Sequence, residues 1–163
     1  MRVARTGTEN LSARHLCNRE SASDFVREIV KLVGDKRAGR VILVGCEHIE
    51  LLIQLAQHGF LDVTCCKGLA GPDAGEMSAD IIIAPAADRE PQFPAVLSRL
   101  THGLQPDAIL ILGTAGALIM TRVKHIQALL IQRGFAFTRM HLEPAGVDLW
   151  CCRKVPESQA HAA

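Results

Sequence analysis

Apolar residues recur with helical spacing in four segments of the chain, and a glycine follows each segment. The apolar positions run from Phe25 to Val33, from Ile49 to Ala56, from Phe93 to Leu100 and from Ile119 to Leu130, and the glycines are Gly34, Gly59, Gly103 and Gly134. Glycine readily adopts the left-handed backbone conformation that closes many helices. The pattern therefore predicts four amphipathic helices that end at these glycines.

Short apolar runs that lack helical spacing lie between these helices. The runs are rich in Ile, Val and Leu at successive positions, which in a strand point to opposite faces, as is typical of strands covered on both faces. The runs are Val41–Val44, Leu61–Cys65, Asp80–Ala84 and Ala108–Leu112. Two further runs, 135–142 and 147–153, flank Glu143-Pro-Ala-Gly146 and predict a hairpin. The whole order predicts an α/β fold with a three-layer, doubly wound, mostly parallel sheet of about six strands and an antiparallel C-terminal hairpin strand.

The length of 163 residues suits one domain, and the apolar share of 48% predicts a large core. Residues 1–20 and 156–163 have the polar and small composition of loose chain ends. We therefore expect a flexible N-terminal tail over residues 1–20, a single Rossmann-like domain over residues 21–155 and a flexible C-terminal tail over residues 156–163.

Charge and hydropathy do not favour a nucleic-acid or membrane partner, although local charged patches remain compatible with the sequence. Lys and Arg number 18 and Asp and Glu 17, so the formal charge of +1 provides no field that would favour nucleic acid or an anionic membrane surface. The longest apolar stretch, Ala108 to Met120, is too short to span a bilayer. The first twenty residues lack the apolar run of a secretory signal, although an arginine-rich transit peptide is a weaker alternative. With six cysteines that we expect to be reduced, the sequence predicts a cytoplasmic protein.

Ligands of open parallel sheets bind beyond the carboxyl ends of the strands, where the strand order reverses. The positions that follow the four predicted parallel strands are Gly45 to His48, Cys66 to Gly68, Pro85 to Glu90 and Gly113 to Gly116. The sequence therefore predicts a binding site composed of these loops.

Several segments carry a resemblance to a known family. They are Arg40-Val-Ile-Leu-Val-Gly-Cys46, Ser78-Ala-Asp-Ile-Ile-Ile-Ala-Pro85, Leu104-Gln-Pro-Asp-Ala-Ile-Leu-Ile-Leu-Gly113, Arg133-Gly-Phe135 and Trp150-Cys-Cys-Arg-Lys154. In these segments and in the order of its elements, the chain resembles the class I S-adenosylmethionine-dependent methyltransferases over about residues 22–154. The resemblance implies a methyltransferase-like Rossmann fold and, at the first crossover, a site for S-adenosylmethionine.

The cofactor motif departs from that family. An acidic-x-Gly-x-Gly-x-Gly turn follows the family's first strand, and this chain has Leu43, Gly45, Glu47 and Ile49 at the corresponding positions. Glu47 places a carboxylate where the carboxylate of the cofactor should lie, and like charges at close range repel. The acidic ribose partner at the end of the second strand is replaced within Thr64-Cys-Cys-Lys67. The resemblance nominates as cofactor-binding residues Gly45, Cys46, Glu47, Lys67, Pro85 and Ala86.

Two functions follow from this comparison. In the first, the domain keeps the scaffold with a degenerate S-adenosylmethionine site and binds an unknown protein or small-molecule partner without catalysis. In the alternative, it is an active S-adenosylmethionine-dependent methyltransferase on an unknown acceptor, with His48 or Asp88 as the catalytic base. A structural role for His48 and a helix-capping role for Asp88 are the simpler interpretations of these two residues.

Other kinds of site find less support. A thiolate–imidazole metal site from Cys46, His48 and Cys65 or Cys66 lacks a C-x-x-C pair, and we expect no metal. A dinucleotide fingerprint would need glycines where the chain has Glu47 and Glu50. The turn from Gly113 to Gly116 is a weak signal for a phosphate site. We expect His58 to cap its helix and Trp150 to lie in the core.

The interval from Lys67 to Ala79 is too short for a helix, a strand and a second helix. The third strand of the family therefore has no counterpart, and the second strand becomes an edge of the sheet. An apolar edge such as Leu61 to Cys66 needs a cover. The cover is either the loop from Gly68 to Gly75, the N-terminal tail or another copy of the chain. Of these, we predict a homodimer that forms through this second-strand edge.

Overall fold

The computed structural model describes residues 19–44, 49–66, 78–87, 95, 97–98, 104–115, 120–143 and 146–155. The helices are α2 (Arg19–Val33), α3 (Ile49–Gln57) and α5 (Met120–Gln132), and a 3-10 turn, η1 (Gly34–Ala38), follows α2. The strands are β1 (Arg40–Val44), β2 (Asp62–Cys66), β3 (Ala79–Ala84), β4 (Leu104–Ala115), β5 (Phe135–Leu142) and β6 (Val147–Lys154).

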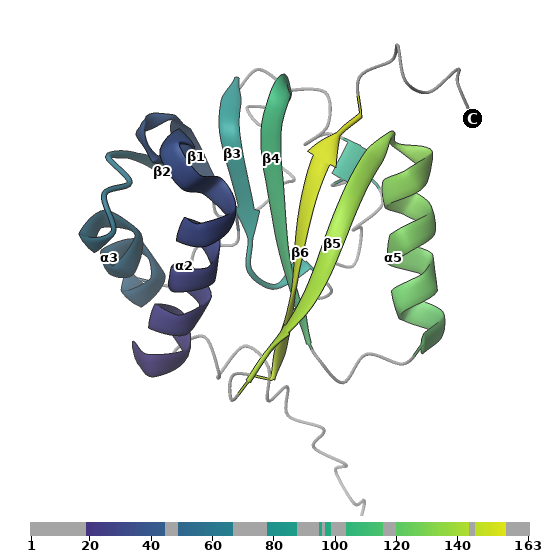
Figure 1. Ribbon diagram of the computed structural model, residues 1–163, viewed down its shortest axis with the longest axis horizontal. Helices are drawn as coiled ribbons and strands as arrows, with labels where there is room; N and C mark the ends of the chain where they lie inside the picture. The colour runs from purple at the N-terminus through teal and green to yellow at the C-terminus, as the bar shows by residue number, and fades with distance from the viewer. Residues whose placement is uncertain are drawn as a thin grey trace, which may run out of the picture.

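These strands form one six-stranded sheet in the order β2-β1-β3-β4-β6-β5. The first four strands in this order are parallel, whereas β6 pairs antiparallel with both β4 and β5. Helices α2 and α3 cover one face and α5 covers the other, which gives three layers (Figure 1). The predicted fold class is therefore confirmed.

Each face of the sheet carries its own apolar cluster, because alternate residues of the parallel strands point to opposite sides. Phe25, Val26 and Ile29 of α2 and Leu51 and Leu55 of α3 pack on one face, against Val41, Leu43, Ile81, Ile83, Ile109 and Ile111. Val123, Ile126 and Leu130 of α5 pack on the other, against Ile42, Val44, Ile82, Leu110 and Leu112. The continuous apolar runs in the sequence thus reflect strands that are buried on both sides.

Glycine closes the helices where the pattern predicts it. Gly34, Gly59 and Gly134 follow α2, α3 and α5 with φ angles of 57°, 87° and 76°. Gly103 lies outside the described residues. At the end of α3, the Nδ1 atom of His58 donates to the carbonyl oxygen of Gln54 at 2.9 Å, which confirms the predicted capping role of this histidine.

Strand β4 is longer than the pattern predicts. The expected strand spanned Ala108–Leu112, but β4 runs from Leu104 to Ala115. At its carboxyl end, pairing with β6 continues through Gly113↔Leu149 and Thr114↔Asp148 to Ala115↔Val147. The interpretation of residues 113–116 as a turn is therefore wrong for residues 113–115, because the antiparallel partner extends the ladder through a sequence that resembles a loop.

No helix in the described part of the chain is long and apolar enough to cross a membrane.

Candidate functional site

The carboxyl ends of β1, β3, β4 and β5 lie along one edge of the sheet, at the lower edge of Figure 1. We call this the carboxyl edge. Two predicted site residues are described there: Pro85 is buried immediately after β3, and Ala86 beside it is half-buried. A Cβ atom on Gly113 of β4 would overlap the carbonyl oxygen of Pro85. The absence of a side chain at Gly113 therefore lets the turn after β3 lie close against β4.

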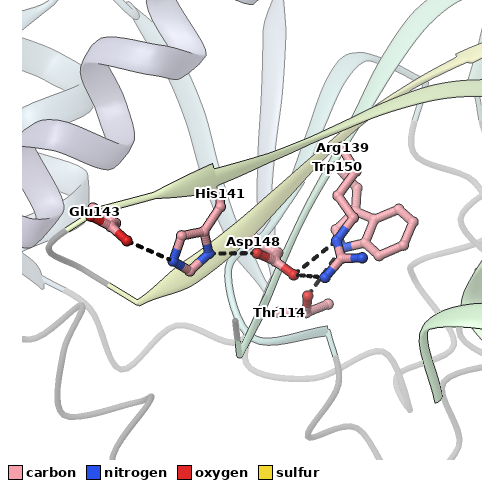
Figure 2. A network of polar contacts seen from close by, with 6 residues as sticks. All are labelled: Thr114, Arg139, His141, Glu143, Asp148 and Trp150. Carbon is pink, nitrogen blue, oxygen red and sulfur yellow. Dashed lines mark hydrogen bonds and ion pairs between the residues drawn. The ribbon is translucent and has the colours of Figure 1, made fainter. Parts of the chain in front are cut away.

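A polar network occupies the same edge on β4, β5 and β6 (Figure 2). The strand register places Thr114, Asp148 and His141 in one row across the three strands, and Leu112, Trp150 and Arg139 in the next row. Side chains in register on neighbouring strands point to the same face. The hairpin therefore brings the polar groups of three strands together on the face that α5 covers.

Asp148 is the centre of this network. Its side chain is 2% exposed, and its Oδ2 atom accepts hydrogen bonds from both Nε, at 2.8 Å, and Nη2 of Arg139. Its other oxygen, Oδ1, lies 2.7 Å from Nδ1 of His141. Burial of a charged carboxylate is costly unless it is paired and hydrogen-bonded. Arg139 and His141 provide those partners.

Trp150 connects the network to the core. The indole is fully buried, and its Nε1 atom donates to Oγ1 of Thr114 at 3.0 Å. The guanidinium of Arg139 lies over the indole, 5.2 Å from the ring centroid, and the ring of Phe137 lies at 5.6 Å. The prediction that Trp150 packs in the core is confirmed. In addition, the indole orients Arg139, which in turn holds Asp148.

The carboxyl end of β2 has two cysteines in place of the charged side chains found on β5 and β6. Cys65 and Cys66 are its last residues and pair with Leu43 and Val44 of β1. Cys66 is half-buried against the apolar cluster on the α5 face, whereas Cys65 is exposed. The acidic residue of this strand, Asp62, lies at its opposite end beside Arg40. The end of β2 therefore presents thiols at the carboxyl edge.

The remaining predicted site residues, Gly45, Cys46, Glu47, His48, Lys67 and Asp88, lie outside the described residues. In the described ranges, no three His, Cys, Asp or Glu side chains are grouped so that they could hold a metal ion.

A shallow hollow of about 440 Å³ lies at the opposite edge of the sheet, between η1 and the starts of β3 and β4. Its lining residues are Lys36, Gly39, Asp80, Gln105 and Asp107. Asp80 accepts a hydrogen bond from the backbone N–H of Arg40 at 2.8 Å, and Lys36 donates to the carbonyl oxygen of Asp107. These polar groups are thus engaged in joining η1 and β1 to the neighbouring strands.

Sequence analysis included Thr114 only as part of the segment from Gly113 to Gly116, and it did not identify Arg139, His141 or Asp148 as site residues. The signal was nevertheless present in the predicted hairpin. A turn at residues 143–146 pairs Leu142 with Val147, and this register places His141 opposite Asp148 and Arg139 opposite Trp150. Alternate residues of a strand point to the same face, so this register predicts that Arg139, His141, Asp148 and Trp150 share one face of the hairpin.

No protein-family model matches the sequence, and no curated protein matches it. Solved structures do match. A methyltransferase from Methanococcus maripaludis, described as a putative S-adenosyl-L-methionine-dependent enzyme, superposes with a TM-score of 0.66 at 12% identity, over 92% of this chain and 90% of that chain. The precorrin-6y C5,15-methyltransferase of Geobacter metallireducens gives 0.62 at 10% identity, over 80% of this chain and 88% of that chain.

A third match is the magnesium protoporphyrin IX methyltransferase of Synechocystis PCC 6803, solved with bound S-adenosylmethionine. It gives a TM-score of 0.60 at 15% identity, over 94% of this chain and 87% of that chain. The chain has the class I methyltransferase fold. In this methyltransferase fold, the network around Asp148 lies on the β4–β6–β5 half of the carboxyl edge, and the thiols of β2 lie on the β1–β2 half.

Proposed function

We propose that this chain is a binding domain on a methyltransferase scaffold, whose S-adenosylmethionine site is degenerate. The observation that carries the proposal is the end of β2. The class I resemblance implies an acidic residue there for the ribose of the cofactor. Cys66 occupies the last position of the strand, next to Val44, and is half-buried against apolar side chains.

A half-buried thiol is a poor substitute for a carboxylate in binding a ribose, because it is a weak hydrogen-bond donor and acceptor. The sequence adds a second argument, since Glu47 stands at a position where the family has glycine. Both departures concern groups that bind the cofactor. We therefore expect the function to reside in binding of a partner or of a different small ligand.

Isothermal titration of the purified full chain with S-adenosylmethionine and S-adenosylhomocysteine tests the proposal. We expect no saturable heat at micromolar ligand, and no copurified cofactor in native mass spectra. A micromolar dissociation constant would overturn the proposal and favour the alternative, an active methyltransferase on an unidentified acceptor. Methyl transfer by His48→Gln and Asp88→Asn variants would then be the next measurement.

Restoring variants test the cause. The Glu47→Gly and Cys66→Asp double variant should bind S-adenosylhomocysteine at least about ten-fold more tightly than the natural chain, because a removed repulsion and an added charge-assisted hydrogen bond are each worth about 1 kcal/mol or more. Cys65→Asp, combined with Glu47→Gly, is the matched control. Cys65 pairs with Leu43 and faces the opposite side of the sheet from Cys66, so this carboxylate should add nothing.

A cytoplasmic location remains our proposal for this domain. Cys65, Cys151 and Cys152 are free thiols, which suits a reducing compartment.

A further inference from the structure

Asp148 fixes the proton on one nitrogen of His141. The carboxylate of Asp148 is buried, and its Oδ2 atom accepts two charge-assisted hydrogen bonds from the guanidinium of Arg139. An ionised carboxylate only accepts hydrogen bonds. Nδ1 of His141, 2.7 Å from Oδ1 of Asp148, must therefore carry the hydrogen and donate it.

The other nitrogen of a neutral His141 is consequently an acceptor. The His141 side chain is 45% exposed, and its Nε2 atom lies 3.9 Å from Oε1 of Glu143, whose side chain is 85% exposed (Figure 2). Two acceptors thus face each other across a gap that solvent can reach. This arrangement is favourable only when a donor lies between them or when the imidazole itself gains a proton.

The charges around this pair favour a cation. From β6, Asp148 contributes a carboxylate, and Glu143 contributes a second one from the turn that follows β5. The guanidinium of Arg139 on β5 is directed to Asp148 and stacked over Trp150. An anionic ligand at Nε2 would meet the exposed carboxylate of Glu143 and the lone pair of the imidazole, whereas a cationic donor would satisfy both acceptors.

We propose that Nε2 of His141 and the carboxylate of Glu143 form a binding site for a cationic amine. An ammonium group would donate one N–H to the imidazole and another to the carboxylate. Both residues lie where β5 ends at the carboxyl edge, which is the edge where open α/β sheets bind ligands. The site does not depend on the proposed loss of S-adenosylmethionine binding, because it lies on the β5–β6 hairpin and not on β1 and β2.

Nuclear magnetic resonance of the ¹⁵N-labelled full chain tests the site with n-butylammonium as the probe. At about pH 8, where a free imidazole is mostly neutral, the His141 ring should show a protonated Nδ1 and an unprotonated Nε2. The His141→Gln variant assigns the signals. Butylammonium should move the Nε2 resonance of His141 along a saturable curve, whereas n-butanol and butyrate at equal ionic strength should not.

A single substitution separates binding from general effects of the salt. Glu143→Gln keeps the size of the side chain and removes its charge, so it should weaken butylammonium binding at least about five-fold. Glu28→Gln is the matched control: this half-buried glutamate on α2 pairs with Lys31, and its replacement should leave binding unchanged.

Three results would overturn the proposal: a linear or absent response of His141 to butylammonium, an equal response to butyrate, or undiminished binding in Glu143→Gln. None depends on a variant of the buried Asp148, so loss of folding cannot hide the answer. The outcome is also independent of the calorimetry with S-adenosylmethionine, since butylammonium carries neither the ribose nor the adenine of that cofactor.

Discussion

Gly113 of β4 and Pro85 after β3 lie so close that a Cβ atom on the glycine would overlap the proline carbonyl oxygen and lie 2.9 Å from its carbonyl carbon. The obstacle is backbone, which cannot rotate away as a flexible side chain can. This contact fixes where the turn after β3 lies at the carboxyl edge.

Gly113→Ala should therefore lower the free energy of unfolding by about 1–3 kcal/mol, the usual cost of an overpacked core. Urea denaturation measures this loss. Because the turn must move to admit the methyl group, amide hydrogen exchange of Ala84, Ala86 and Ala87 should accelerate. Gly146→Ala is the comparison. A Cβ there meets open space, and the strain of its φ of 61° should leave exchange at Ala84, Ala86 and Ala87 unchanged. Unaltered exchange in Gly113→Ala would contradict the prediction.

Much of this architecture follows from the chain alone, and the reason is local. The helix ends were predictable at Gly34, Gly59 and Gly134 because their positive φ angles require glycine. The parallel strands were predictable because burial on both faces makes them apolar throughout. In contrast, the extent of β4 depends on β6, a partner that lies more than thirty residues away from the β4 end along the chain. The network around Asp148 depends on how β6 pairs with β4 and β5. Without that pairing, polar residues in a predicted hairpin indicate exposure to solvent.

The buried ion pair of Asp148 should contribute more to the free energy of unfolding than an exposed pair between the same types of residue. Asp148→Asn removes the charge that Arg139 and His141 share, and should cost about 1–3 kcal/mol of unfolding free energy. Asp24→Asn breaks the exposed pair of Asp24 with Arg27 on α2, whose atoms lie 2.9 Å apart, and should cost less than about 1 kcal/mol. Chemical denaturation of both variants compares the two sites. Equal losses would show that burial does not strengthen the Asp148 pair.

The hydrogen bond of the buried indole provides a separate test. Thr114→Val keeps the volume of the side chain but removes the acceptor for Nε1 of Trp150, and a buried donor left without a partner costs about 1–3 kcal/mol. Thr138→Val, the same change at an exposed position of β5, should stay within about 0.5 kcal/mol of the natural chain. Trp150 is the single tryptophan, so its fluorescence follows unfolding directly in both variants. A neutral Thr114→Val would refute the energetic role of this bond.

The thiols should differ sharply in reactivity. The measurement uses a Cys17→Ser, Cys46→Ser variant. Cys65 is exposed, so it should react with a disulfide reagent in the folded protein. Cys151 and Cys152 are 5% and 0% exposed, so they should react only on unfolding. Thiol titration against time, with and without urea, distinguishes the two classes. Fast reaction of Cys152 in the folded chain would contradict its placement in the core.

The same burial predicts a pH dependence of stability. Burial, and next the charge of the neighbouring Cys151, raises the pKa of Cys152 above its ordinary value of 9.0. The unfolded chain releases this proton at a lower pH than the folded chain, so the free energy of unfolding should fall as the pH rises above about 9. Cys152→Ala should be less stable at neutral pH but show a shallower fall. Denaturation at intervals between about pH 7.5 and 10.5 measures the slopes, and equal slopes would exclude this cause.

The β2 edge predicts self-association, and we propose that two copies pair through β2. Among the described strands, β2 and β5 are the two edges of the sheet. Three of the five large apolar side chains exposed in the described ranges lie on the β2 side, on α3 or immediately before β2: Ile49, Ile53 and Leu61. A strand edge is self-complementary about a two-fold axis, and no lysine or proline of β2 blocks the approach.

Light scattering should therefore give a mass of twice 17.7 kDa. Leu61→Lys places a charge beside the edge and should shift the equilibrium to monomer, because a charged side chain at an edge opposes strand pairing. Ile131→Lys, at a 65% exposed position of α5 on the other side of the sheet, is the matched control and should remain dimeric. A monomer of the natural chain at high concentration, or an equal effect of both lysines, would remove the case for pairing through β2.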